Sequence, residues 1–391
     1  MPPKPKPKNL ADTLAELRSK KQLKIGSLAD FDMNVKGMST GNIAIDAITG
    51  CWGLPRGRVI ELFGPPSSGK TTTALQAAAA AQKYAVENTT GKVGLFLDYE
   101  KSLDEKYCRA LGLDPDDASF VYMQPDSFEE GANVFRQLLA TGELDYLIVD
   151  SVASMVTENE LNADTGKAVL ADRAKMMHQF MRQISGTLHQ AEVPAIFLNH
   201  MLDVVDITPM GQKLAGQGIK RKTTAGGMAL KFYASMRIEF KQLGNVRSSV
   251  LDPLTNELVD DIRQTKIQAT CVKNKVGIPY RQAELRVRYG LGFSQAYSVL
   301  NILTAHKIVK KGGAGMFTFP ADLAPTADAE PFTLRGEESV IQALEGDSEW
   351  LGRLAKVAQA KLIESEIPSV DATLYDENGD LIETKDEPDG Y

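Results

Sequence analysis

The sequence predicts an α/β fold with a mostly parallel sheet, helices on both of its faces and an extension of antiparallel strands. One observation is a glycine-rich stretch, residues 64–71, which fits the pattern G-x-x-x-x-G-K-[ST]. It lies between an apolar run at residues 58–63 and an alanine-rich run at residues 71–81, the strand–turn–helix order that a phosphate-binding loop needs. The other observation is that apolar runs alternate with helical patterns from residue 58 to about residue 240. Strands that alternate with helices form parallel sheets covered on both faces.

The glycine-rich stretch predicts a site for a nucleoside triphosphate. Its glycines allow backbone N–H groups to surround a phosphate, while Lys70 can reach the β- and γ-phosphates and the Thr71 hydroxyl can hold Mg²⁺. A chance glycine turn is a poor alternative because both flanking patterns fit. The residues expected at the nucleotide are Gly64, Pro65, Pro66, Ser67, Ser68, Gly69, Lys70, Thr71 and Thr72.

Length and composition predict an ordinary globular chain. Its 391 residues, of which 43% are hydrophobic and 24% charged, suffice for one large domain or two to three smaller ones. The apolar runs are far shorter than a membrane span, and no apolar segment follows the N-terminal lysines, so we expect neither a membrane segment nor a secretory signal. Cys51, Cys108 and Cys271 lie far apart and suit neither a zinc site nor a disulfide framework. A reducing, cytoplasmic compartment is expected.

Charge is spread unevenly along the chain. Residues 364–391 hold ten acidic residues against Lys385, a charge of −9, and because the whole chain carries −7 the rest carries +2. Such a tail either competes with polyanions for a basic surface or only aids solubility. At the other end, residues 1–8 form a Pro/Lys arm and residues 9–23 have the pattern of an amphipathic helix. A helix so short needs a surface to pack on, which could belong to a neighbouring subunit.

Further segments continue the strand–helix alternation. Strands are expected at residues 93–98, 120–123, 145–150 and 194–198, and helices at residues 104–111, 128–139 and 173–190. Residues 162–171 and 201–224 interrupt this rhythm, and the second segment contains three glycines and four basic residues. Both leave the sheet at the carboxyl ends of its strands, where ligands bind. Basic, glycine-rich loops suit a phosphodiester backbone.

After residue 230 the pattern becomes that of antiparallel strands. We expect strands at residues 234–240, 265–272 and 282–287, with an exposed hairpin or loop at residues 245–264. A small α/β domain should follow, with a helix at residues 295–306, one strand at residues 316–319 and two helices within residues 337–363.

Acidic and polar residues end three of the predicted strands. Asp150 ends an apolar strand and is the expected support for Mg²⁺, acting through water ligands. Glu100 lies two residues beyond Asp98 of another strand, and spacing alone does not decide which carboxylate would be the general base on the attacking water. His200 follows the next strand and either contacts the γ-phosphate, reporting it to the segment that begins at Met201, or is a structural histidine.

Four stretches together resemble the bacterial RecA recombinase family, over roughly residues 10–365. They are residues 64–72, residues 150–153 (DSVA), residues 223–235 (TTAGGMALKFYAS) and residues 272–275 (VKNK). The resemblance implies a RecA-like P-loop core at residues 37–289, after an N-terminal arm and oligomerisation helix at residues 1–36. A small C-terminal domain at residues 290–363 and an acidic tail at residues 364–391 would follow.

The resemblance also implies a function. The chain would be an ATP-dependent recombinase that uses Mg²⁺, forms a helical homo-oligomer on single-stranded DNA and exchanges strands with homologous duplex DNA, in the cytoplasm of a bacterial or phage-infected cell. The alternatives that stay open are a RecA-like ring ATPase or helicase and an ATP-binding filament or mediator protein without strand exchange.

The resemblance assigns individual residues as well. Glu100 would be the catalytic glutamate, with His200 as γ-phosphate sensor, and Asp104 and Tyr107 would contact the adenine. Lys273 and Lys275 would reach the γ-phosphate of a neighbouring subunit, and Phe232 would lie at the interface. Two DNA-binding loops, residues 162–171 and 201–224, and the segment after them would supply the DNA contacts. These are Val169, Leu170, Arg173, Val205, Met210, Lys213, Ile219, Lys220, Arg221, Lys222, Gly226 and Gly227.

The sequence departs from the family pattern at several positions. His200 replaces the usual glutamine sensor, a substitution similar to one in phage recombinases, and Pro66 replaces a common glutamate. The longer loop has no aromatic residue, so an apolar side chain such as Met210 would have to separate the base steps. These departures suggest a phage-encoded or otherwise distant member of the family.

Overall fold

The computed structural model describes residues 34–163, 170–203, 222–225, 227–251, 258–326 and 330–366. Contacts divide the chain into Met1–Lys36 and Gly37–Tyr391, and the elements named below belong to the second unit. The amphipathic helix predicted at residues 9–23 and the tail beyond residue 366 lie outside the described residues. No helix in the described ranges is both long enough and apolar enough to cross a membrane.

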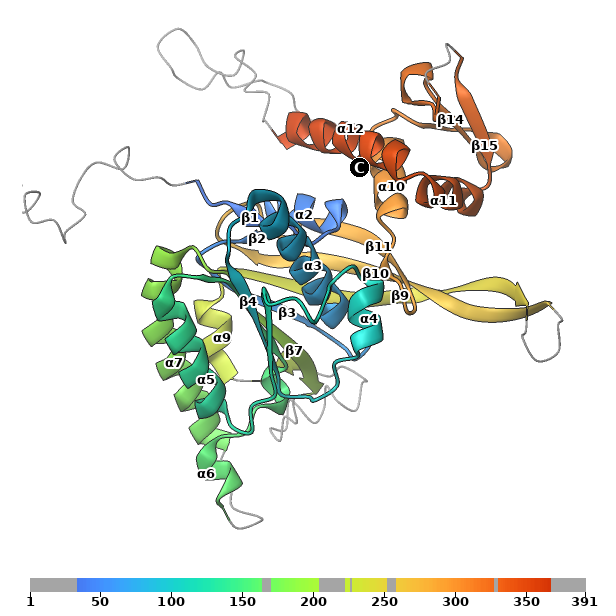
Figure 1. The fold of residues 1–391 in the computed structure, drawn as a ribbon. Helices are drawn as coiled ribbons and strands as arrows, with labels where there is room; N and C mark the ends of the chain where they lie inside the picture. The colour runs from blue at the N-terminus through green and yellow to red at the C-terminus, as the bar shows by residue number, and fades with distance from the viewer. Residues whose placement is uncertain are drawn as a thin grey trace, which may run out of the picture. The chain divides into compact units, whose positions relative to one another are not determined.

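A ten-stranded sheet lies at the centre of this unit (Figure 1). Its strand order is β12-β11-β10-β9-β3-β7-β6-β4-β5, and β8 pairs with β7. Strands β9, β3, β7, β6, β4 and β5 run parallel, whereas β10, β11 and β12 continue from β9 as antiparallel strands. This topology confirms the predicted fold class. The strands are β3 (Val59–Gly64), β4 (Val93–Asp98), β5 (Phe120–Met123), β6 (Leu144–Asp150), β7 (Ala195–Asp203), β8 (Lys222–Thr224), β9 (Met236–Leu251), β10 (Leu258–Asn274), β11 (Gln282–Arg288) and β12 (Gly292–Phe293).

Successive residues of the central strands point into two separate cores. In β3, Ile60 and Leu62 belong to the core on one face, whereas Val59 belongs to the core on the other. In β6, Ile148 and Leu147 are divided in the same way. Because side chains alternate along a strand and both faces are covered, these strands are apolar at nearly every position.

Helices cover both faces of the sheet (Figure 1). One face carries α2 (Ile43–Thr49), α3 (Lys70–Asn88) and α4 (Glu105–Ala110), and the other carries α5 (Phe128–Thr141), α7 (Leu170–Ala191) and α9 (Gly227–Tyr233). The alanines of α3 explain how it approaches the sheet: Ala74, Ala77 and Ala78 are fully buried, and their small side chains allow the helix to lie close. Short elements flank these layers: β1 (Gly37–Met38), β2 (Leu54–Pro55) and α6 (Glu158–Leu161).

The C-terminal elements have a core of their own around Phe319 and Trp350. The sequence predicts one strand there, but the structure has a three-stranded antiparallel sheet. The two other strands escaped prediction because one has only two residues, both lysines, and the other follows a stretch of turn-type residues. The elements are α10 (Gln295–Ala305), β13 (Lys310–Lys311), β14 (Met316–Phe319), β15 (Phe332–Arg335), α11 (Glu337–Gly346) and α12 (Ser348–Glu366).

Two predicted loops differ in part from the structure, and the segment expected as an exposed hairpin or loop forms the hairpin. In the segment at 201–224, residues 201–203 continue β7 and residues 222–224 form β8. The last two residues of the segment at 162–171 already belong to α7, which begins at Leu170. The segment at 245–264 is a hairpin, since β9 and β10 stay paired as far as Leu251 and Leu258 (Figure 1). Apolar and polar residues alternate little in this segment. The two strands are therefore recognised by their pairing with each other and not by the sequence pattern of either strand.

Candidate nucleotide-binding site

The phosphate loop connects the end of β3 to the start of α3, as the sequence predicts. Gly69 caps the helix with a φ of 90°, and a Cβ there would lie 2.8 Å from the ring of Phe293. At Gly64 a Cβ would lie 2.3 Å from the carbonyl oxygen of Phe240. Ser67 also has a positive φ, 56°. The positive φ at Ser67 and Gly69 and the close packing at Gly64 and Gly69 explain why this tight turn needs its glycines, and α3 begins directly after the turn, where backbone N–H groups can bind a phosphate.

Lys70 lies inside this loop and is largely buried. Its Nζ donates hydrogen bonds to the carbonyl oxygens of Pro65, at 2.8 Å, and Gly64, at 3.3 Å. Burial lowers the pKa of Lys70, and the nearby Asp150 and Glu100 carboxylates counteract that effect. Neutral carbonyl groups are weak partners for an ammonium group, so a phosphate in the loop would be a stronger one.

A cavity of about 450 Å³ opens beside the loop. It is lined by residues 66–72 together with Glu100, Tyr107, Asp150, His200, Val287, Tyr289 and Gly290. Many of the lining residues lie near the carboxyl ends of the parallel strands β3, β4, β6 and β7, where such strands deliver side chains to one side of the sheet. Antiparallel β11 adds Val287, with Tyr289 and Gly290 just beyond it.

Asp150 and Thr71 form the part of the cavity that suits Mg²⁺. The Thr71 Oγ1 donates a hydrogen bond of 2.8 Å to Asp150 Oδ2. Across the described residues, no group of three or more His, Cys, Asp or Glu side chains is placed to hold a metal by itself. One carboxylate and one hydroxyl fit Mg²⁺, because this ion keeps several water ligands and takes the others from a few protein groups and from the substrate phosphates.

The structure distinguishes Asp98 from Glu100, the two carboxylates that sequence spacing leaves open as the general base. Asp98 is almost completely buried, at 1% exposed. It accepts hydrogen bonds from the backbone N–H groups of residues 100–103 and from the Tyr122 hydroxyl, which occupies both of its oxygens. Glu100 instead lines the cavity. The geometry therefore favours Glu100 as the group that meets a water, with Asp98 holding the segment that carries it.

Glu100 is held by two neighbours at the same oxygen. Its Oε1 lies 2.5 Å from the donating Ser151 Oγ and 2.9 Å from His200 Nε2. Burial raises the pKa of Glu100, but the hydrogen bonds from Ser151 and His200 and the charge of Lys70 outweigh it, so the pKa lies below its ordinary value. Glu100 is thus a carboxylate at neutral pH, the form that a general base needs.

Comparisons with known proteins agree with this geometry. The model of the RecA N-terminal domain matches residues 9–294, which is most of the chain. The chain belongs to the RecA family. One relative, Protein RecA of Salinispora arenicola (strain CNS-205), is 36% identical over 283 residues, or 72% of this chain and 73% of that protein. Among solved structures, the crystal structure of the RadB recombinase has a TM-score of 0.43 at 17% identity, covering 66% of this chain and 98% of the other.

Of the two residues expected at the adenine, one lines the cavity of this RecA-family site and the other does not, and two residues that the sequence did not single out line it as well. Tyr107 lines the cavity as expected, and its hydroxyl lies 2.7 Å from Thr72 Oγ1. Asp104 does not line it and instead caps the N-terminus of α4. Tyr289 and Gly290, just beyond β11, complete the lining. A strand that runs into a glycine turn is the signal that could have identified them.

The two lysines assigned to a neighbouring subunit do not line the cavity of their own RecA-family chain. Lys273 Nζ donates hydrogen bonds to the carbonyl oxygens of Lys231, at 2.7 Å, and Phe232, at 3.1 Å, and so caps the C-terminus of α9. The backbone N–H of Lys275 donates to Ser235. Burial lowers the pKa of Lys273, as do the nearby charges of Lys275 and Arg237.

Most of the residues assigned to DNA lie outside the described part of this RecA-family chain. Arg173 on α7 forms an ion pair of 2.9 Å with Glu160 and donates to the Ala153 carbonyl oxygen at 3.3 Å. Gly227 begins α9 with a φ of 70°. For Leu170 and Lys222 only the backbone is described, in α7 and β8. The residues outside the described ranges are Val169, Val205, Met210, Lys213, Ile219, Lys220, Arg221 and Gly226.

Asp150 makes the nucleotide-free protein sensitive to pH. Burial raises the pKa of Asp150 to about 7, with further contributions from its charged neighbours. An unfolded chain gives an aspartate a pKa of about 4. The folded chain therefore binds this proton more tightly, and stability is lost as the pH rises from about 4 to about 7.

Asp150→Asn is therefore expected to raise the Tm of the nucleotide-free protein by about 2–4 °C at pH 8, because no buried charge remains there. At about pH 4.5 the two proteins should melt together. Thermal melts at both pH values check this, and equal Tm values at pH 8 would contradict it.

Proposed function

We propose that this RecA-family chain is an ATP-dependent recombinase. It would form helical filaments on single-stranded DNA and catalyse homologous pairing and strand exchange with duplex DNA, in recombination and repair, with DNA-dependent ATP hydrolysis. The observation that carries the proposal is the position of one cavity. Its phosphate loop, Asp150 and Glu100 meet His200 at the strand edge from which the segment predicted to bind DNA departs.

The cavity residues divide the chemistry of hydrolysis among them. Bound ATP supplies the γ-phosphoryl group, and Mg²⁺ offsets the charge of its oxygens. Lys70 is placed to hold the β- and γ-phosphates, and Thr71 and Asp150 would hold the ion, Asp150 through water. Glu100 would accept a proton from the attacking water, and its fixed position beside Ser151 orients it for that task.

His200 is proposed to connect the nucleotide to DNA. It is the residue of β7 that lies opposite Gly64 of β3, directly before the strand pairs with β8. A γ-phosphate would compete with Glu100 for the His200 ring, and this competition would move the end of β7. Histidine can donate one hydrogen bond here in place of the glutamine amide that is usual in the family.

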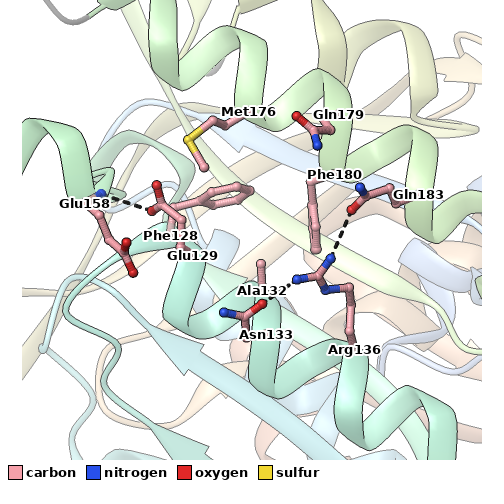
Figure 2. A pocket seen from close by; sticks show the side chains of 10 residues that line it. All are labelled: Phe128, Glu129, Ala132, Asn133, Arg136, Glu158, Met176, Gln179, Phe180 and Gln183. Atoms are coloured by element: carbon pink, nitrogen blue, oxygen red, sulfur yellow. Dashed lines mark hydrogen bonds between the residues drawn. The ribbon is translucent and has the colours of Figure 1, made fainter.

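Assembly into a filament is supported by an exposed apolar surface on α9. The groove of about 310 Å³ between α5 and α7 is not such a surface, since its Phe128 and Phe180 side chains are buried and polar residues make up most of its lining (Figure 2). On α9, Met228 and Phe232 are 60% and 67% exposed. We propose that a second copy of this chain covers Met228 and Phe232, because large exposed apolar side chains next to one another mark an interaction site.

Electron microscopy and a strand-exchange assay test the proposed function. With ATP, Mg²⁺ and single-stranded DNA the chain is expected to form helical filaments, and adding homologous duplex DNA should give exchanged products, whereas a heterologous duplex should not. With a slowly hydrolysed ATP analogue the filaments should persist. Closed rings without filaments would favour a ring ATPase or helicase. Filaments without exchange would favour an ATP-binding mediator.

A further inference from the structure

A carboxylate is buried in the middle of the central sheet, outside the lining of the nucleotide cavity. Glu61 lies in β3, three residues before Gly64, and is completely buried, at 0% exposed. Its neighbours along the strand, Ile60 and Leu62, are apolar core residues. A buried charge strongly destabilises a fold unless partners compensate for it.

Two partners on the flanking strands compensate the charge of Glu61. Arg237 of β9 donates from Nε to Glu61 Oε2 at 2.5 Å, and its guanidinium lies 4.4 Å from the centre of the Phe63 ring. Asn199 of β7 donates from Nδ2 to Glu61 Oε1 at 2.8 Å. The carboxylate thus joins three adjacent strands of the sheet, β7, β3 and β9.

Asn199 connects Glu61 to two functional positions. Its Nδ2 also donates to the carbonyl oxygen of Ala225, at 2.9 Å, and its Oδ1 accepts from the backbone N–H of His200, at 2.9 Å. His200 precedes the segment at 201–224 and Ala225 follows it, so one buried amide holds both ends of that segment. Because Glu61 accepts from this amide, the carboxylate fixes which way the amide faces.

We propose that Glu61 is a positioning residue that acts through Asn199, coupling the nucleotide contact at His200 to the base of the DNA-binding segment at Ala225. This inference rests on the proposed function, since it requires that nucleotide and DNA binding depend on each other. It goes beyond that function by assigning the coupling to a group that touches neither ligand. Stability alone is a weak explanation for the ion pair, because a buried pair can often be replaced by apolar residues without loss.

The coupling can be measured as a ratio of two DNA affinities. Fluorescence anisotropy with a labelled single-stranded oligonucleotide gives the Kd in the presence of ADP and in the presence of a slowly hydrolysed ATP analogue. We expect the wild-type ratio to be at least tenfold, in keeping with ordinary coupling between sites. Glu61→Gln should bring the ratio to within about twofold of one, because Arg237 and Asn199 donate to different oxygens of the carboxylate, and the amide NH₂ that replaces one of these oxygens cannot accept a hydrogen bond. Affinity for a fluorescent ATP analogue should stay within about twofold of wild type.

Asp46→Asn is the matched control. Asp46 is also a buried carboxylate, but its hydrogen bonds come from Ser39 and Thr40. The same change of carboxylate to amide there should leave the ratio at its wild-type value, whatever it does to Tm. Loss of the ratio in both variants would show a general effect of instability and overturn the positioning role.

The remaining outcomes distinguish this inference from the proposed function. A wild-type ratio near one refutes the proposed coupling of ATP to DNA and this inference with it. A tenfold wild-type ratio that Glu61→Gln leaves intact refutes the positioning role alone. If Glu61→Gln does not fold, Asn199→Ser, which removes the amide but retains a polar group, carries the test, and the same loss of the ratio is expected.

Discussion

Glu100→Gln is expected to slow DNA-stimulated ATP hydrolysis by about 10²–10⁴-fold while leaving ATP affinity nearly unchanged, because general-base catalysis contributes factors of this size. The amide has the shape of the carboxylate and retains an oxygen that can accept from Ser151. It cannot accept a proton from water at neutral pH. Steady-state turnover with saturating DNA, together with a direct ATP-binding titration, separates the loss of chemistry from any loss of binding.

Asp98→Asn serves as the counterpart, since both substitutions turn a carboxylate into an amide at the end of β4. Asp98 accepts four backbone N–H groups, so an amide nitrogen in its place should lower the Tm. Its effect on turnover should be far smaller than that of Glu100→Gln. The reverse order of the two rate losses would make Asp98 the base, and unchanged turnover in Glu100→Gln would remove the catalytic assignment.

The core of the fold follows from local patterns, which explains why the sequence predicted it well. Strand β4 at residues 93–98 was predicted to the residue, and the phosphate loop has the expected strand and helix on its two sides. Apolar runs of five to seven residues between helical stretches have few other solutions, because a fully buried strand must be covered on both faces. Short edge strands such as β13 carry no such signal.

The candidate site was predictable as a set of residue types but not as a set of contacts. Glu100 and Asp98 look alike in the sequence, and only the turn that wraps backbone N–H groups around Asp98 tells them apart. Tyr289 reaches the cavity from β11, far along the chain, because β9, β10 and β11 extend the sheet past the phosphate loop. Nothing in the sequence distinguishes Glu61 from an ordinary polar residue in an apolar strand. Its partners Asn199 and Arg237 are 138 and 176 residues away in sequence.

The loss of Lys275 is expected to reduce ATP hydrolysis at least a hundredfold, if its charge reaches the γ-phosphate held by a neighbouring subunit as an arginine finger does. Lys275→Ala is the cleaner variant, since Lys273 also caps α9 within its own chain. ATP binding by the separate chain should not change, because Lys275 does not line that chain's cavity. Lys310→Ala, an exposed lysine of the small C-terminal sheet, is the matched control and should keep wild-type turnover.

Mixing two inactive variants decides whether the site is shared between subunits. Lys70→Ala lacks the phosphate-loop lysine, and Lys275→Ala lacks the contribution to the neighbour. In a head-to-tail filament assembled at random from equal amounts, about one junction in four pairs an intact Lys70 with an intact Lys275. Turnover should therefore recover to about a quarter of the wild-type rate. If Lys275 acted within its own chain, every site would stay defective and the mixture would be as inactive as either variant alone.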